Sequence, residues 1–149
     1  MKIKHSVEIN KPIEVVAKYF ADPEYLSFYQ DGFLRKEMIS GAPGEDGSVS
    51  HMYYKQGKRE MEIVETITAN NLPQAFEGFY HHAHMDNTMK VTFTALEDDR
   101  TLYESEIEYI RISWIMPKLI SILFPGMFRK PPAKWMKNFK DFVENQTTI

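Results

Sequence analysis

The segment that most constrains the fold is Pro131–Gln146, the clearest amphipathic helix pattern after residue 33. Pro131 and Pro132 suit a helix start, where a missing backbone N–H leaves no carbonyl without its partner. The apolar side chains that follow recur at the spacing of one helical face: Trp135, Met136, Phe139, Phe142 and Val143. Because the segments before this helix read as strands, its aromatic face must be buried against a sheet. We therefore expect an α+β fold in which a curved antiparallel sheet grips one long C-terminal helix and tends to leave a cavity.

Length, charge and composition exclude several classes of protein. The 149 residues suit one core, so we expect residues 1–149 to form a single domain. A net charge of -3 gives no reason to expect a nucleic-acid partner. The chain has no cysteine, which excludes disulfides and thiolate catalysis. The first residues lack the apolar core of a secretion signal, so we expect a cytoplasmic protein.

Between residues 2 and 112, apolar and polar side chains alternate in the manner of half-buried strands. The pattern predicts strands at residues 2–10, 33–40, 48–55, 58–68, 76–85, 88–96 and 102–112. After the first strand, residues 11–20 and 24–29 predict two short helices, which Asp22-Pro23 separates. The chain therefore reads as one strand, two short helices, six strands and a long helix.

Two hairpin turns decide which side chains of the middle strands face the core. We expect two-residue turns at Gln56-Gly57 and at Asp86-Asn87. The resulting cross-strand pairs include Tyr54 with Arg59 and Tyr80 with Phe93. Because side chains alternate along a strand, both registers place the Met, Tyr and His side chains of these strands on one inner face.

The order of these elements resembles the helix-grip fold of the START and Bet v 1-like (SRPBCC) superfamily. Residues 11–24 resemble its first helix and the Asp-Pro-Glu break, residues 40–47 its glycine-rich turn, and residues 63–76 a strand entering a proline turn. The resemblance covers essentially the whole chain and is closest to the polyketide cyclase/dehydrase and lipid-transport branch. It implies an elongated apolar cavity between sheet and C-terminal helix that binds lipids, hormones, polyketides or other hydrophobic molecules. Some members of the superfamily are enzymes and many are not, so residues must decide the function.

Projected onto this fold, the inner face supplies the candidate ligand-binding residues. Methionine and aromatic walls with a few polar groups are what a pocket for an apolar, ring-bearing ligand requires. The candidates are Met52, Tyr54, Arg59, Met61, Tyr80, His82, His84, Phe93, Tyr103, Trp135, Met136 and Phe139. Each of them also fits a plainer interpretation, in which it simply fills the core.

The polar candidates carry more chemical information than the apolar ones. His82 and His84 lie two apart, so we expect them on one face of a strand, as an acid/base pair or as metal ligands. A zinc site needs a third ligand, and Glu65 lacks recognisable ligand spacing, so we expect no metal. We expect Arg59 and Glu65 to pair with each other or to orient a ligand carbonyl or carboxylate. No dinucleotide or phosphate-loop motif occurs, so we expect no cofactor.

The segment Ile115–Arg129 is more apolar than a short connection needs. It is interpreted as a lid over the cavity mouth, as a dimer contact, or as a weak membrane contact in which basic side chains meet anionic head groups. The oligomeric state stays open between these alternatives.

The sequence therefore predicts a domain that binds, and in one interpretation transports, a hydrophobic small molecule or lipid. The first alternative is a polyketide cyclase or dehydratase-like enzyme that uses cavity Tyr, His and Arg side chains as acids and bases. Between the two, we favour a domain without enzymatic activity. The second alternative is a protein-binding regulator.

Overall fold

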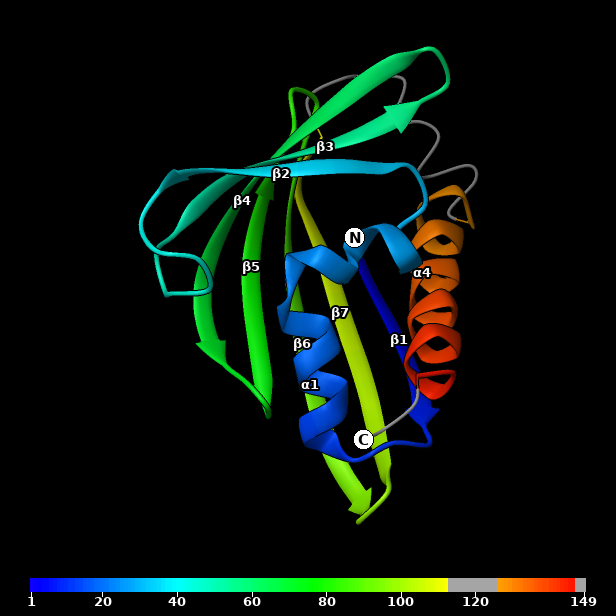
Figure 1. The fold of residues 1–149 in the computed structure, drawn as a ribbon. Helices are drawn as coiled ribbons and strands as arrows, with labels where there is room; N and C mark the ends of the chain where they lie inside the picture. Colours follow the sequence, from blue (N-terminus) through cyan, green and yellow to red (C-terminus); the bar gives the residue numbers. More distant parts are fainter. Residues whose placement is uncertain (113–125, 147–149) are drawn as a thin grey trace.

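A computed structural model of the chain describes residues 1–112 and 126–146. Its helices and strands follow the predicted order (Figure 1). They are β1 (Lys2–Ile9), α1 (Ile13–Ala21), the 3-10 helix η1 (Pro23–Tyr25), α2 (Leu26–Tyr29), β2 (Phe33–Ser40), β3 (Val49–Gln56), β4 (Arg59–Asn71), β5 (Ala75–His81), β6 (Met85–Glu97), β7 (Arg100–Ile112) and α4 (Gly126–Glu144).

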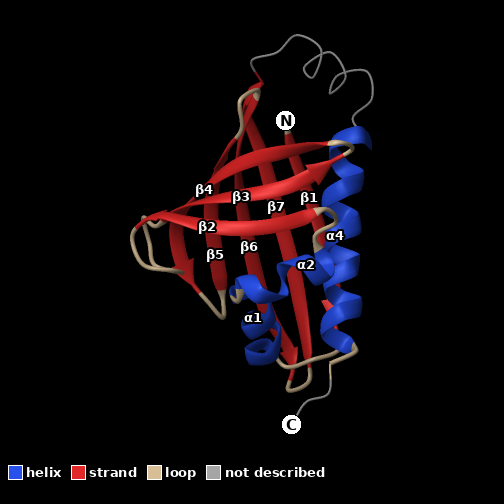
Figure 2. Ribbon diagram, turned by 45° about the horizontal axis from the view of Figure 1, so that its top comes forward, coloured by secondary structure: helices blue, strands red, loops and turns tan. Residues whose placement is uncertain are grey.

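Within the described residues the strands form one seven-stranded antiparallel sheet in the order β1-β7-β6-β5-β4-β3-β2. The sheet is strongly curved, so that β2 and β3 cross the view at a steep angle to β1 and β7, and α4 lies along β1 (Figure 2). The expected face of α4 is the buried one: Met136, Phe139 and Val143 are 6%, 2% and 0% exposed. The prediction of a sheet that grips a C-terminal helix is confirmed.

The hairpin between β3 and β4 has a different register from the predicted one. Gln56 pairs with Arg59 and Tyr54 with Met61, so the turn residues are Gly57 and Lys58. Gly57 has a φ of +61°, and glycine at the first position is what a type II′ turn requires. The pairing moves by two residues, and an even shift leaves every side chain on its predicted face.

A second glycine sits where two strands come close. Gly32, just before β2, has a φ of +80°, and a Cβ atom there would lie 2.8 Å from the carbonyl oxygen of Lys55. We expect Gly32→Ala to lower the free energy of unfolding by about 1–3 kcal/mol, because it adds a backbone clash to an unfavourable φ. The measurement is urea denaturation.

Gly57→Ala is the matched control for Gly32→Ala. It also has a positive φ, but a Cβ at residue 57 meets nothing within 4 Å. This variant should lower the free energy of unfolding only by the cost of a positive φ, about 1 kcal/mol. Equal losses in the two variants would show that the contact with Lys55 adds nothing.

The turn between β5 and β6 also differs from the prediction. The backbones of His82 and Met85 exchange two hydrogen bonds, of 2.8 and 3.2 Å, so Ala83 and His84 form the turn. Asp86 and Asn87 were expected to form it but belong to β6. Asp and Asn are common in turns, so local preference favours a turn at these residues. Asp86 is instead bound by Arg111 of β7, and such a long-range contact is not encoded in the local sequence.

Helix α4 begins earlier than predicted. Its backbone is helical from Gly126, so Pro131 and Pro132 lie inside it instead of at its start. Proline inside a helix removes a backbone hydrogen bond and crowds the preceding turn, and this local cost is the reason that the sequence pattern placed both prolines at the helix start. Most of Ile115–Arg129 lies outside the described residues, and its last four residues belong to α4. No helix in the described part of the chain is long and apolar enough to cross a membrane.

Candidate functional site

A cavity of about 910 Å³ lies between the concave face of the sheet, α2 and α4. Strands β2 to β7 supply its walls, largely through alternate residues, because every second side chain of a strand points inward. The apolar walls include Met52, Met61, Ile63, Phe76, Met89 and Met136. Such walls can pack around an apolar ligand, but they offer no hydrogen bonds that would fix its orientation.

Most of the predicted site residues line this cavity. They are Met52, Tyr54, Met61, Tyr80, His82, Tyr103, Trp135, Met136 and Phe139. Arg59, His84 and Phe93 are not part of its lining. Phe93 is 2% exposed and packs against Phe20 and Tyr103, so it belongs to the core beneath the cavity.

The polar centre of the cavity is Glu65 on β4. Its side chain is 7% exposed, and its two oxygens accept hydrogen bonds from different strands. Lys36 Nζ donates to Oε1 at 2.8 Å, and the Tyr80 hydroxyl donates to Oε2 at 2.7 Å. Burial, and then the charge of Glu65 and this hydrogen bond, raise the pKa of Tyr80 well above its usual value. Tyr80 therefore remains a neutral donor at physiological pH.

Lys36 is a largely buried charged residue of the cavity that sequence reasoning missed. Phe33 of β2 pairs with Tyr54 of β3, and Arg35 pairs with the adjacent residue of β3, Tyr53. Leu34 is therefore an extra residue in β2. This bulge breaks the two-residue period, and Lys36 thereby joins Phe33 on the inner side. A strict alternation from Phe33 would have placed Lys36 outside.

Arg59 does not pair with Glu65, contrary to the prediction. With Gly57 and Lys58 in the turn, Arg59 is the first residue of β4, and it is exposed. Lys36 takes the expected place of Arg59 as the cation beside Glu65. The physical reason is distance along the strand: Arg59 and Glu65 both belong to β4, and their separation of six residues spans about 20 Å at a rise of about 3.3 Å per residue.

Tyr54 and Trp135 form an aromatic part of the cavity wall. Their rings stack at 5.6 Å between centroids, and the Tyr54 hydroxyl donates to Gln30 Oε1 at 2.7 Å. Burial, followed by the charge of Glu65, raises the pKa of Tyr54. A stacked pair of this kind offers a flat surface to a planar ring.

His82 and His84 do not share a strand face, contrary to the prediction. His84 is in the turn and exposed, and its backbone N–H donates to His82 Nδ1 at 3.2 Å. His82 borders the cavity. Burial, and then the charges of His84, His81 and Arg111, lower the pKa of His82, so it is neutral at pH 7. The shift of the turn is the physical reason for the difference.

An ion pair fixes this end of the cavity. Arg111 donates to both Asp86 oxygens, at 2.7 and 3.2 Å, and to the carbonyl oxygen of His82 at 2.9 Å. The hydrogen bond from Arg111 is the main cause that lowers the pKa of Asp86. The pair joins β6 and β7 directly beside the turn that carries His82.

We expect this pair to make stability depend on pH in the acid range. Because the folded state lowers the pKa of Asp86, its contribution is complete above the unfolded value of about 3.9 and is lost as pH falls further. Asp86→Asn should therefore be less stable than the wild type at pH 6, and the difference should shrink toward pH 3. Chemical denaturation at both pH values measures it.

Asp99→Asn, in the exposed turn between β6 and β7, is the control and should show the same difference at both pH values. The free energies of unfolding of the wild type and Asp86→Asn could instead differ by the same amount at pH 6 and pH 3. The Asp86–Arg111 pair would then not be the source of that difference.

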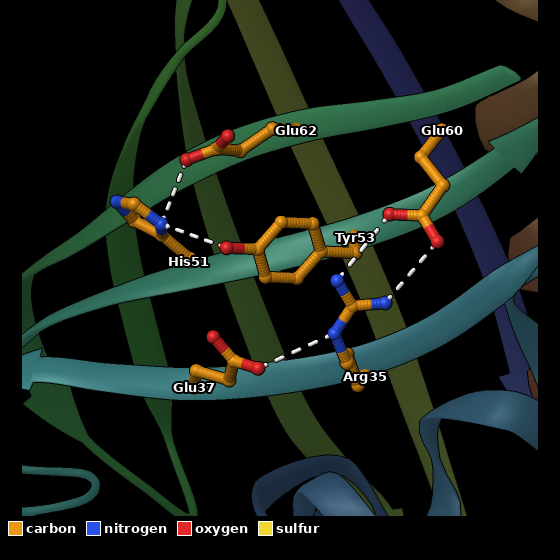
Figure 3. Close-up of polar contacts among 6 residues, drawn as sticks. All are labelled: Arg35, Glu37, His51, Tyr53, Glu60 and Glu62. Carbon is orange, nitrogen blue, oxygen red and sulfur yellow. Dashed lines mark hydrogen bonds and ion pairs between the residues drawn. The ribbon is translucent and has the colours of Figure 1, made fainter.

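The outer face of β2, β3 and β4 carries a separate polar network (Figure 3). Arg35 binds Glu60 and Glu37, each at 3.3 Å, and its guanidinium lies 4.0 Å from the centre of the Tyr53 ring. His51 contacts Glu62 at 2.7 Å. Ion pairs this exposed contribute little to stability. The network marks the solvent side of strands whose other side lines the cavity.

The polar groups of the cavity offer hydrogen bonds to a guest. Among residues 1–112 and 126–146, no three His, Asp or Glu side chains are grouped so that they could hold a metal ion. The largely buried polar groups that line the cavity include the Glu65 carboxylate, the Lys36 ammonium group and several hydroxyl groups. These can accept and donate hydrogen bonds to a guest.

Comparisons with known proteins agree with the architecture. No protein-family model and no curated protein matches the chain. An aromatase/cyclase from Streptomyces sp. R1128 is 9% identical, with a TM-score of 0.78 over 97% of this chain and 93% of that chain. A START superfamily protein from Mycobacterium smegmatis is 12% identical, with a TM-score of 0.77 over 98% and 99%. Norcoclaurine synthase from Thalictrum flavum, solved with dopamine and hydroxybenzaldehyde, is 15% identical, with a TM-score of 0.71 over 99% and 89%.

Identities this low bear on the fold alone. The curved antiparallel sheet, the short helices after β1 and the C-terminal helix are those of the helix-grip fold of START and Bet v 1-like proteins. The fold expected from the sequence is confirmed.

Proposed function

We propose that this helix-grip domain binds one hydrophobic, ring-bearing small molecule or lipid between the concave face of the sheet and α4. The observation that carries the proposal is the cavity of about 910 Å³ with its methionine and aromatic walls. Pockets for small molecules have volumes of about 300–1,000 Å³ and mostly apolar walls with few polar groups.

The size of the cavity supports ligand binding over simple core packing. Protein interiors are packed as densely as organic crystals, and most of their voids are no larger than a water molecule. An apolar guest that fills the cavity gains about 25 cal/mol for each Å² of apolar surface removed from water. The methionine side chains adapt to guests of different shape.

Two structural neighbours support a ring-bearing ligand. One is an aromatase/cyclase, and norcoclaurine synthase was solved with two aromatic molecules, dopamine and hydroxybenzaldehyde. The stacked Tyr54–Trp135 pair gives this chain its own surface for a planar ring.

A titration with Nile red, a neutral apolar dye, tests the proposal. We expect its fluorescence to rise on binding and to saturate at one dye per chain. Native mass spectrometry of the purified protein should also detect a bound molecule that organic solvent extracts. A folded protein that neither binds Nile red nor carries an extractable ligand would contradict the proposal.

Acid/base catalysis on a carbonyl compound is a second candidate. It is favoured by the buried Glu65, which lies beside a phenol donor and an ammonium group. Glu65 would take a proton from the carbon next to the carbonyl, and Lys36 would stabilise the enolate oxygen. The wild type should then accelerate hydrogen-deuterium exchange at the α-carbon of 2-tetralone, and Glu65→Gln should not. Equal exchange rates with and without the protein would exclude this reaction for that ketone.

A further inference from the structure

We propose that the Glu65–Lys36 pair selects neutral ligands that carry a hydroxyl or carbonyl oxygen and excludes carboxylate ions. This inference rests on the proposed function, because it concerns the same cavity. Lys36 comes from β2 and Glu65 from β4, with β3 between them, and their side chains meet at 2.8 Å. Their side chains are 19% and 7% exposed, so the pair is largely shielded from water.

The charges inside the cavity are balanced before a ligand enters. Asp31 also borders it, but its carboxylate is 53% exposed and pairs with Lys134 at 2.9 Å, and Lys55 is exposed. His82 is neutral at pH 7, as described above. Among the described lining residues, the buried charges are therefore one ammonium and one carboxylate.

A carboxylate ligand would disturb this balance. It would have to share Lys36 with Glu65, which leaves two carboxylates beside one ammonium in a region of low dielectric. A buried charge without a partner is strongly unfavourable. The cavity should therefore reject an anion even when the apolar part of that molecule fits.

A neutral oxygen, in contrast, finds partners at the same place. The ammonium group of Lys36 has three N–H donors, and Glu65 takes one of them. A ligand carbonyl or hydroxyl oxygen can accept another. A ligand hydroxyl can also donate to the oxygen of Tyr80, which itself donates to Glu65. The site thus suits ring-bearing alcohols, phenols and ketones.

Two fluorescent probes with one ring system test the selection. They are 1-pyrenemethanol, which is neutral, and 1-pyrenecarboxylate, which is an anion at pH 7; pyrene itself reports apolar binding alone. We expect the wild type to bind the alcohol at least about tenfold more tightly than the carboxylate, the size of one charge-assisted hydrogen bond. This comparison needs no variant.

Glu65→Gln should reverse the preference. It frees the charge of Lys36, so the affinity for 1-pyrenecarboxylate should rise at least about tenfold while that for pyrene stays unchanged. The double variant Lys36→Gln/Glu65→Gln should lose this gain. Glu62→Gln, on the outer face of the same strand, is the matched control and should leave all three affinities unchanged.

The outcomes separate the two proposals. If pyrene and 1-pyrenemethanol do not bind to the folded wild type, ligand binding in the cavity is itself contradicted. All three probes could bind while the wild type shows equal affinity for 1-pyrenemethanol and 1-pyrenecarboxylate, or while Glu65→Gln leaves the ratio of these two affinities unchanged. Either result would support ligand binding in the cavity and overturn charge selection.

Discussion

Phe139→Ala is expected to lower the free energy of unfolding by about 3–5 kcal/mol, the usual cost of truncating a buried phenylalanine. Phe139 is 2% exposed, and its ring packs edge-on against Phe20, Tyr29 and Tyr103. It therefore joins α4 to α1, α2 and β7 at once. Urea denaturation followed by circular dichroism measures the loss.

Lys137→Ala is the control, because Lys137 lies on the exposed face of the same helix. Its effect should stay within about 0.5 kcal/mol. A loss below about 1 kcal/mol for Phe139→Ala would contradict the claim that this ring joins α4 to α1, α2 and β7.

Filling the cavity is expected to have the largest effect on binding. Ile63 and Met89 line it from β4 and β6. The double variant Ile63→Trp/Met89→Trp adds two large side chains to the cavity, which occupy volume that a ligand would need. We expect Nile red to bind at least about tenfold more weakly, equivalent to about 1.4 kcal/mol.

Ile110→Trp is the matched control for cavity filling, since Ile110 is 55% exposed and borders no part of the cavity. It should leave the affinity for Nile red unchanged. If the filled variant is folded and binds Nile red as tightly as the wild type does, the dye binds elsewhere.

The faces of the strands were predictable from the sequence even where the registers were wrong. Tyr54 was expected to pair with Arg59 and pairs with Met61, a shift of two residues. Tyr80 was expected to pair with Phe93 and pairs with Asn87, a shift of six. Both shifts are even, so the inner residues within the strands stayed inside, whereas Arg59 and His84 came to lie at or beside the turns and are exposed. Apolar patterning therefore identified the walls of the cavity without identifying its hairpin turns.

The polar centre of the cavity was not predictable in the same way. Lys36 faces inward because of the bulge at Leu34, and neither Leu34 nor its two neighbours is a glycine that would have indicated a bulge. Its pairing with Glu65 spans β3 and depends on the curvature of the whole sheet. Arg59 was the expected partner because it shares a strand and a face with Glu65, but six residues of β4 hold the two about 20 Å apart.

Methyl NMR of the protein labelled with 13C-methyl methionine tests the central claim most directly. Met52, Met61, Met89 and Met136 line the cavity from four different elements, whereas Met1 does not. On titration with 1-pyrenemethanol, we expect ring currents to shift these four methyl signals together, with one saturation curve, while Met1 stays in place. Unmoved signals from Met52, Met61, Met89 and Met136 would contradict a ligand site between the sheet and α4.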